Sequence, residues 1–96
     1  MVQVRLDLAP TGISDGPWAY MAKLGIGFKG NRAEFPVPDS NELQEVQLTF
    51  SANTLAAKVD YELYLDDVFK KKGTAKMYHG TVGSLTIRFF LKAPKL

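Results

Sequence analysis

Apolar and polar residues alternate along five windows of this 96-residue chain. A period of two places every second side chain on the same face of an extended strand, whereas a helix needs apolar residues three and four positions apart. Each window therefore predicts a strand with one buried face and one solvent-exposed face. The windows are residues 2–8, 18–28, 46–52, 59–65 and 85–91.

Four of these windows predict the core directly, because their inward positions are all apolar. The inward residues are Val2, Val4, Leu6, Leu8, Val46, Leu48, Phe50, Ala52, Val59, Tyr61, Leu63, Leu65, Leu85, Ile87, Phe89 and Leu91. Residues 33–37 continue the alternation through Ala33, Phe35 and Val37. Pro36 and Pro38 cannot donate backbone hydrogen bonds, so we expect this strand at a sheet edge.

The window at residues 18–28 has two interpretations. Trp18, Tyr20, Ala22, Leu24, Ile26 and Phe28 alternate without a break, which predicts one long strand with these side chains inward. Ser14 or Asp15 as an N-cap, Pro17 in a first turn and Gly25 as a stop would instead bracket a short helix over residues 18–24. We favour the long strand.

Asp66 and Asp67 lie where a tight hairpin should turn, because Asp tolerates left-handed backbone angles better than most residues. A two-residue loop would set Leu63 opposite Lys70. A bulged or longer turn suits the core better, so that is the turn we expect. Its inward side would carry Phe69, Lys71, Gly73, Ala75 and Met77.

About seven short strands separated by turn residues predict an all-β domain that spans residues 1–96. We expect a two-sheet antiparallel β-sandwich, immunoglobulin-like only in the broad sense, with a small β-barrel as the alternative. The chain contains no cysteine, which excludes disulfides and thiolate chemistry. It also shows no signal-peptide pattern and no stretch of ~20 apolar residues, so we expect no membrane insertion and leave its location open.

The net charge of +2 is unevenly distributed. From Val68 onward there are seven basic residues and no acidic one. Lysines interleaved with Phe69 and Tyr78 predict one alternative function, nucleic-acid binding, because ammonium groups contact phosphates while aromatic rings stack on bases. Edge strands also carry lysines simply to prevent aggregation. The residues of this alternative are Lys70, Lys71, Lys72, Lys76 and Arg88.

Three outward positions of the alternating windows carry large apolar side chains: Met21, Tyr64 and Phe90. If they share one exposed sheet face they form an apolar patch, and such patches mark protein contacts. We therefore predict a non-catalytic structural or protein-interaction module that self-assembles as a homo-oligomer or binds a protein partner, as a component of a larger particle or appendage. A third function, carbohydrate binding, would use Trp18, Tyr20 or Tyr64, although the inward register expected for Trp18 and Tyr20 favours the core.

We predict no enzyme, cofactor or metal site from these residues. His79 is the only histidine and has no sequence partner for acid–base chemistry. Gly25, Gly27 and Gly30 match the spacing of a phosphate-binding glycine motif, yet the prolines that follow cannot start the helix which that motif requires. Turn and bulge roles are therefore expected for the glycines, and turn formation rather than calcium binding for Asp66 and Asp67.

Overall fold

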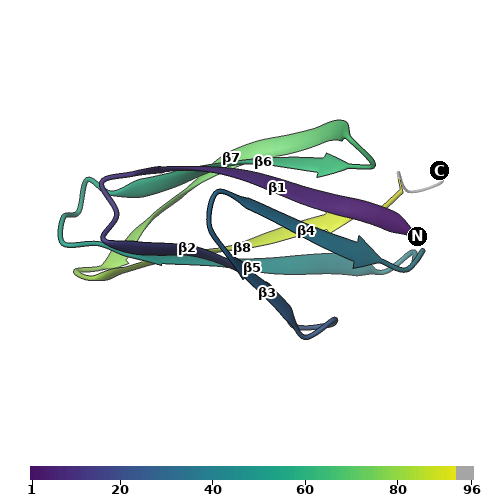
Figure 1. Ribbon diagram of the computed structural model, residues 1–96, viewed down its shortest axis with the longest axis horizontal. Helices are drawn as coiled ribbons and strands as arrows, with labels where there is room; N and C mark the ends of the chain where they lie inside the picture. Colours follow the sequence, from purple (N-terminus) through teal and green to yellow (C-terminus); the bar gives the residue numbers. More distant parts are fainter. Residues whose placement is uncertain (93–96) are drawn as a thin grey trace.

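The computed structural model describes residues 1–92, without the side chains of Tyr78 and His79. Its eight strands form one antiparallel sheet that folds over on itself (Figure 1). The strands are β1 (Val2–Thr11), β2 (Asp15–Met21), β3 (Ile26–Lys29), β4 (Arg32–Val37), β5 (Leu43–Ser51), β6 (Lys58–Leu65), β7 (Val68–His79) and β8 (Val82–Phe90). Their spatial order is β3-β2-β5-β8-β7-β6-β1-β4. Residues 93–96 lie outside the described residues.

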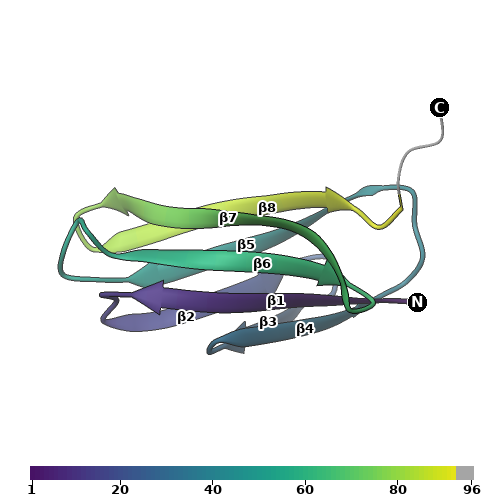
Figure 2. The same ribbon diagram turned by 90° about the horizontal axis from the view of Figure 1, so that it is seen from above.

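The folded sheet has two layers. One layer holds β4, β1, β6 and β7, and the other holds β3, β2, β5 and β8 (Figures 1 and 2). The β7–β8 hairpin joins the layers on one side, and β3 also touches β4 on the other. The predicted all-β fold is confirmed, with eight strands rather than seven, in an architecture between a sandwich and a nearly closed barrel.

The core lies between the two layers and is filled mainly by the residues that the alternation marked as inward. Val4, Leu6, Val46, Leu48 and Phe50 have no exposed surface. Ile87 and Phe89 of β8 and Val59 and Leu63 of β6 pack into the same cluster. The strand predicted from Pro36 and Pro38 as an edge is β4, which ends the strand order and pairs only with β1 through Val2↔Val37 and its neighbours.

The prediction for residues 18–28 is wrong, and so is the helical alternative. The chain forms two strands, β2 and β3, joined by a turn over residues 22–25 in which Gly25 adopts a φ of +66°. The side chains in the core are Ala19 and Met21 rather than Trp18 and Tyr20. Residues 18–21 are all apolar or aromatic, so alternation cannot decide which pair of side chains faces inward. The bulge between Asp15 and Trp18 determines which face of β2 turns toward the core.

The β6–β7 hairpin turns through two residues. Asp66 and Asp67 have φ values of +49° and +66°, as a type I′ turn requires, and Leu65 pairs with Val68. A bulge follows, because Tyr64 pairs with Phe69 whereas Leu63 pairs with Lys71. The turn therefore has the two residues that the prediction disfavoured. The bulge beside it puts Lys71 in the inward register, as predicted, but Phe69 faces outward.

Replacing Asp66 is expected to show that its carboxylate ties the hairpin to the first strand. Asp66 Oδ1 accepts a hydrogen bond from the Gln3 N–H at 2.8 Å, and the Asp66 N–H donates to the Gln3 carbonyl at 2.9 Å. Asp66→Ala should lower the free energy of unfolding by about 1 kcal/mol in urea denaturation, because it removes the acceptor at a left-handed position. Asp66→Asn keeps an acceptor oxygen and tolerates the left-handed backbone, so it should lower the free energy of unfolding by less. Equal losses in the two variants would show that the Asp66 side chain does not hold the hairpin to β1.

Candidate binding surfaces

The three residues predicted as a contact patch do not share one face. Met21 is fully buried, so its predicted outward orientation is wrong. Tyr64 lies on the outer side of β6, partly covered by the Arg5 guanidinium 4.3 Å from its ring centroid. Phe90 lies at the end of β8 in the other layer and is exposed. The structure therefore leaves Tyr64 and Phe90 as surface residues on opposite layers.

Exposed apolar side chains nevertheless gather at one end of the molecule, which we call the Phe90 end. Phe90 pairs directly with Leu43 across β8 and β5, and both side chains are exposed. Val68 and Phe69 of the β6–β7 hairpin lie at the same end, as does the N-terminus (Figures 1 and 2). The Phe90 end is defined here by Met1, Leu43, Val68, Phe69 and Phe90. Alternation could not find Leu43, because it precedes the predicted window.

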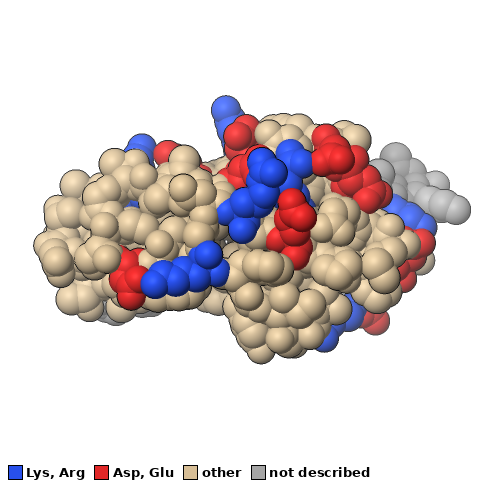
Figure 3. Space-filling view, in the orientation of Figure 1, with Lys and Arg blue, Asp and Glu red and all other residues tan. Residues whose placement is uncertain are grey.

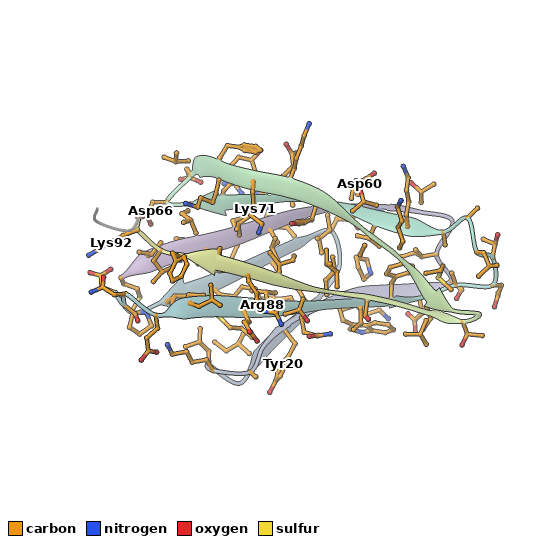
Figure 4. The ribbon with its side chains drawn as sticks, turned by 180° about the vertical axis from the view of Figure 1, so that it is seen from behind. Tyr20, Asp60, Asp66, Lys71, Arg88 and Lys92 are labelled. Atoms are coloured by element: carbon orange, nitrogen blue, oxygen red, sulfur yellow. The ribbon has the colours of Figure 1, made fainter. Side chains whose placement is uncertain are left out.

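Between the two layers at this end runs a seam without backbone pairing. Within residues 1–92, β7 and β8 share ladder pairs only at Met77↔Gly83 and His79↔Val82, beside their turn. Farther along, Lys71 spans the seam and its ammonium donates to the Arg88 carbonyl oxygen at 2.8 Å. Figure 4 shows Lys71 pointing from β7 toward β8. The Arg88 carbonyl thus faces the seam, and backbone groups two residues away in a strand point the same way.

The five basic residues of the nucleic-acid hypothesis are divided among different surfaces. Lys70 is exposed at the bulge of β7. Lys72 and Lys76 lie on the outer face of β7, where Lys72 is opposite Glu62. Lys71 points into the seam, and Arg88 forms an ion pair with Glu45 at 3.0 Å on the outer face of the other layer. The side chain of Tyr78, the aromatic residue proposed to stack on a base, lies outside the described residues.

A hollow of about 610 Å³ opens on the outer side of β1, β6 and β7. Asp7, Asp60, Glu62 and Lys72 line it. Arg32 binds Asp7 at 3.1 Å, and Thr74 donates to Asp60 at 2.6 Å, so two of its carboxylates already have protein partners. Tyr61 also lines the hollow, and burial raises the pKa of its phenol. Acidic and basic side chains are intermixed on the neighbouring β1–β4 side of the molecule (Figure 3).

The two aspartates of the β6–β7 turn have structural partners. Asp66 accepts from Gln3, and Asp67 forms an ion pair with Arg5. Within the described part of the chain, no group of three or more His, Asp or Glu side chains is arranged to hold a metal ion. The His79 side chain lies outside that part. Gly25 and Gly30 adopt positive φ in turns, as their turn interpretation predicted.

Trp18 and Tyr20 lie on the outer face of β2, which corrects their predicted place in the core. Tyr20 is 47% exposed and points away from the molecule (Figure 4). Trp18, two residues before Tyr20 on β2, faces the same side of the sheet and pairs with Thr49 of β5 and Lys29 of β3. Lys29 also binds Asp15 at 2.9 Å. This contact, followed by the Gly16 N–H, holds the pKa of the Asp15 carboxyl below its usual range.

The chain matches no protein-family model, no curated protein and no solved structure. Among residues 1–92, no helix is long and apolar enough to cross a membrane. What the chain does must therefore be argued from its own surfaces.

Proposed function

We propose that this chain is a non-catalytic protein-interaction module that associates with a second copy of itself through the Phe90 end. The observation that carries the proposal is the grouping of exposed apolar side chains there. Leu43 and Phe90 form one exposed cross-strand pair on the β5–β8 layer, and Val68 and Phe69 are exposed at the same end on the β6–β7 hairpin of the other layer. An aromatic side chain removes 150–250 Å² from water when it is buried, so these residues would supply much of the driving force for an interface.

The charges at the same end support a second copy as the partner. A two-fold interface brings one patch against itself, so each charged group needs a group of opposite sign within the same patch. Asp66 and Lys92 both lie at this end (Figure 4), and Asp39 and Glu42 flank it from the loop before β5. Asp39 pairs with the N-terminal ammonium at 3.3 Å and Glu42 with Lys23 at 2.9 Å, so charges of both signs flank the apolar residues, as a two-fold contact requires.

The two terminal strands of the sheet are protected against pairing with another chain, which also favours the Phe90 end as the place of association. Pro36 lies within β4, and β3 has only four residues, so both ends of the strand order are poor templates for a further strand. Along the seam, β8 carries no proline, and among the described residues the Lys71 ammonium donates to one group, the Arg88 carbonyl. The least protected backbone edge therefore lies beside the exposed apolar residues.

Phe90→Ser is expected to shift the protein from dimer toward monomer. The substitution removes the aromatic ring from the centre of the proposed contact while leaving the buried residues of β8 unchanged. Light scattering over a concentration series measures the mass. We expect at least a tenfold increase in the concentration at which half of the protein is dimeric, which corresponds to about 1.4 kcal/mol.

Val82→Ser is the matched control. Val82 is 46% exposed compared with 41% for Phe90, it belongs to the same strand, and it lies at the opposite end of the molecule. The control should keep the wild-type mass. A wild type that stays monomeric up to about 1 mM, or an equal shift in both variants, would overturn self-association through the Phe90 end.

A further inference from the structure

The outer face of β2, β5 and β8 carries a surface of a different kind from the Phe90 end. Two cross-strand rows of outward residues run over it. One row contains Tyr20, Gln47 and Thr86, and the other contains Trp18, Thr49 and Ser84. None of these six side chains is charged, and Trp18 and Tyr20 stand two residues apart on one strand, about 7 Å along it. We call these six residues the aromatic face.

Both aromatic rings of this face lie against glycine. A methyl group built on Gly27 would meet Tyr20 Cδ2 at 3.2 Å, and one on Gly16 would meet Trp18 Cε3 at 3.0 Å. At both positions the side-chain atoms nearest the added methyl belong to the aromatic residue itself. Glycine at these positions thus makes room for the two rings, and Tyr20 projects from the face beside Gly27.

Ion pairs limit the aromatic face at both ends. Asp15 and Lys29 pair beside Trp18 at 2.9 Å, and the Lys29 ammonium lies 5.5 Å from the centroid of the Trp18 ring. Beyond Tyr20 and Gln47, Glu45 pairs with Arg88 at 3.0 Å. The neighbouring charges therefore neutralise one another, and between them lie amide and hydroxyl groups. Thr86 Oγ1 already donates to Gln47 Oε1 at 2.9 Å, which orients that amide.

We infer that the aromatic face binds a neutral saccharide. Pyranose rings present C–H groups on their faces and hydroxyl groups around their rims. Aromatic rings receive the C–H faces, and the Gln47 amide with the hydroxyls of Thr49, Ser84 and Thr86 can exchange hydrogen bonds with the rim. Because the charges at both ends are paired, the face offers no free partner to an anionic ligand. This site is separate from the Phe90 end and does not depend on self-association.

Trp18 provides a direct probe, because it is the only tryptophan in the chain. Its fluorescence is titrated with hexasaccharides of β-linked glucose, xylose, mannose and N-acetylglucosamine, and with a hexamer of β-linked uronic acid as the anionic comparison. We expect a saturable change in emission with at least one neutral hexamer and none with the uronic acid. Absence of saturation with every neutral hexamer, or equal binding of the anionic one, would overturn the inference.

Tyr20→Ala locates the site, with Phe69→Ala as its matched control. Tyr20 and Phe69 are equally exposed at 47%, and Phe69 lies on the other layer. Tyr20→Ala should weaken binding of the neutral hexamer at least tenfold, and Phe69→Ala should leave it within twofold. Gly27→Ala should also weaken binding, because its methyl displaces the Tyr20 ring without removing it. Equal weakening by Tyr20→Ala and Phe69→Ala would contradict the site, whatever the mass measurement shows.

Discussion

Gly83→Ala is expected to be the most destabilising single methyl addition at any glycine of the described residues. Gly83 is buried in β8, and an added Cβ would lie 2.2 Å from Phe50 Cζ and 2.4 Å from Cε1. Phe50 is fully buried in the core, so its ring cannot swing into solvent. We expect a loss of about 3 kcal/mol in the free energy of unfolding, which is roughly 12 °C or more in Tm for a domain of this size.

Two further variants separate the steric contact from a general effect of losing glycine. Gly80→Ala adds the same methyl at the turn between β7 and β8, where no atom of the described residues lies within 4 Å, and should change stability by less than about 0.5 kcal/mol. Phe50→Leu removes ring atoms from the contact and should recover part of the loss when combined with Gly83→Ala. Additive losses in the double variant would show that Phe50 is not the obstacle.

Gln44→Met is expected to stabilise the protein although it removes a hydrogen-bonding group. Gln44 is 1% exposed and occupies an inward position of β5, opposite Phe89. Its Nε2 donates to the Glu42 carbonyl at 3.2 Å, but its buried Oε1 has no partner among the described residues. An unsatisfied buried acceptor costs about 1–3 kcal/mol, and methionine has nearly the same shape. We expect a gain of about 1–2 kcal/mol in urea denaturation.

Gln3→Met is the control for this gain. Gln3 is exposed on the outer face of β1, so the same substitution there satisfies no buried group and should leave stability within about 0.5 kcal/mol. A lower free energy of unfolding for Gln44→Met would contradict this expectation. It would mean that the side-chain Oε1 of Gln44 has a hydrogen-bond partner in solution, so that the amide stabilises the fold.

The alternation was informative wherever only one face of a strand is apolar. In β1, apolar Val4 and Leu6 are separated by Arg5, so the buried face is unambiguous and the structure confirms it. In β2, four successive apolar or aromatic residues carry no such contrast. The bulge near Gly16 then decides that small Ala19 and flexible Met21 face the core, and the aromatic face follows from that choice.

Which residues meet on the surface could be predicted only where no long-range strand pairing was needed. Phe90 could be predicted as exposed because it breaks the alternation of its own strand. Its neighbour Leu43 could not be assigned, because their contact depends on the register between β5 and β8, which lie some forty residues apart in the chain. The inward position of Lys71 follows from a local bulge and was predicted, whereas its bond to the Arg88 carbonyl depends on how the layers diverge.

The seam between β7 and β8 makes the two ends of the molecule mechanically unequal. Beside the β7–β8 turn, backbone ladder bonds hold the layers together, so their spacing there is determined by the peptide geometry. At the Phe90 end the spacing is determined by side chains, among them the long, flexible Lys71. A change in the spacing of the two layers at this end therefore breaks no ladder hydrogen bond between β7 and β8. The width of a surface built there is thus set by side-chain packing, whereas the ladder sets the spacing at the opposite end.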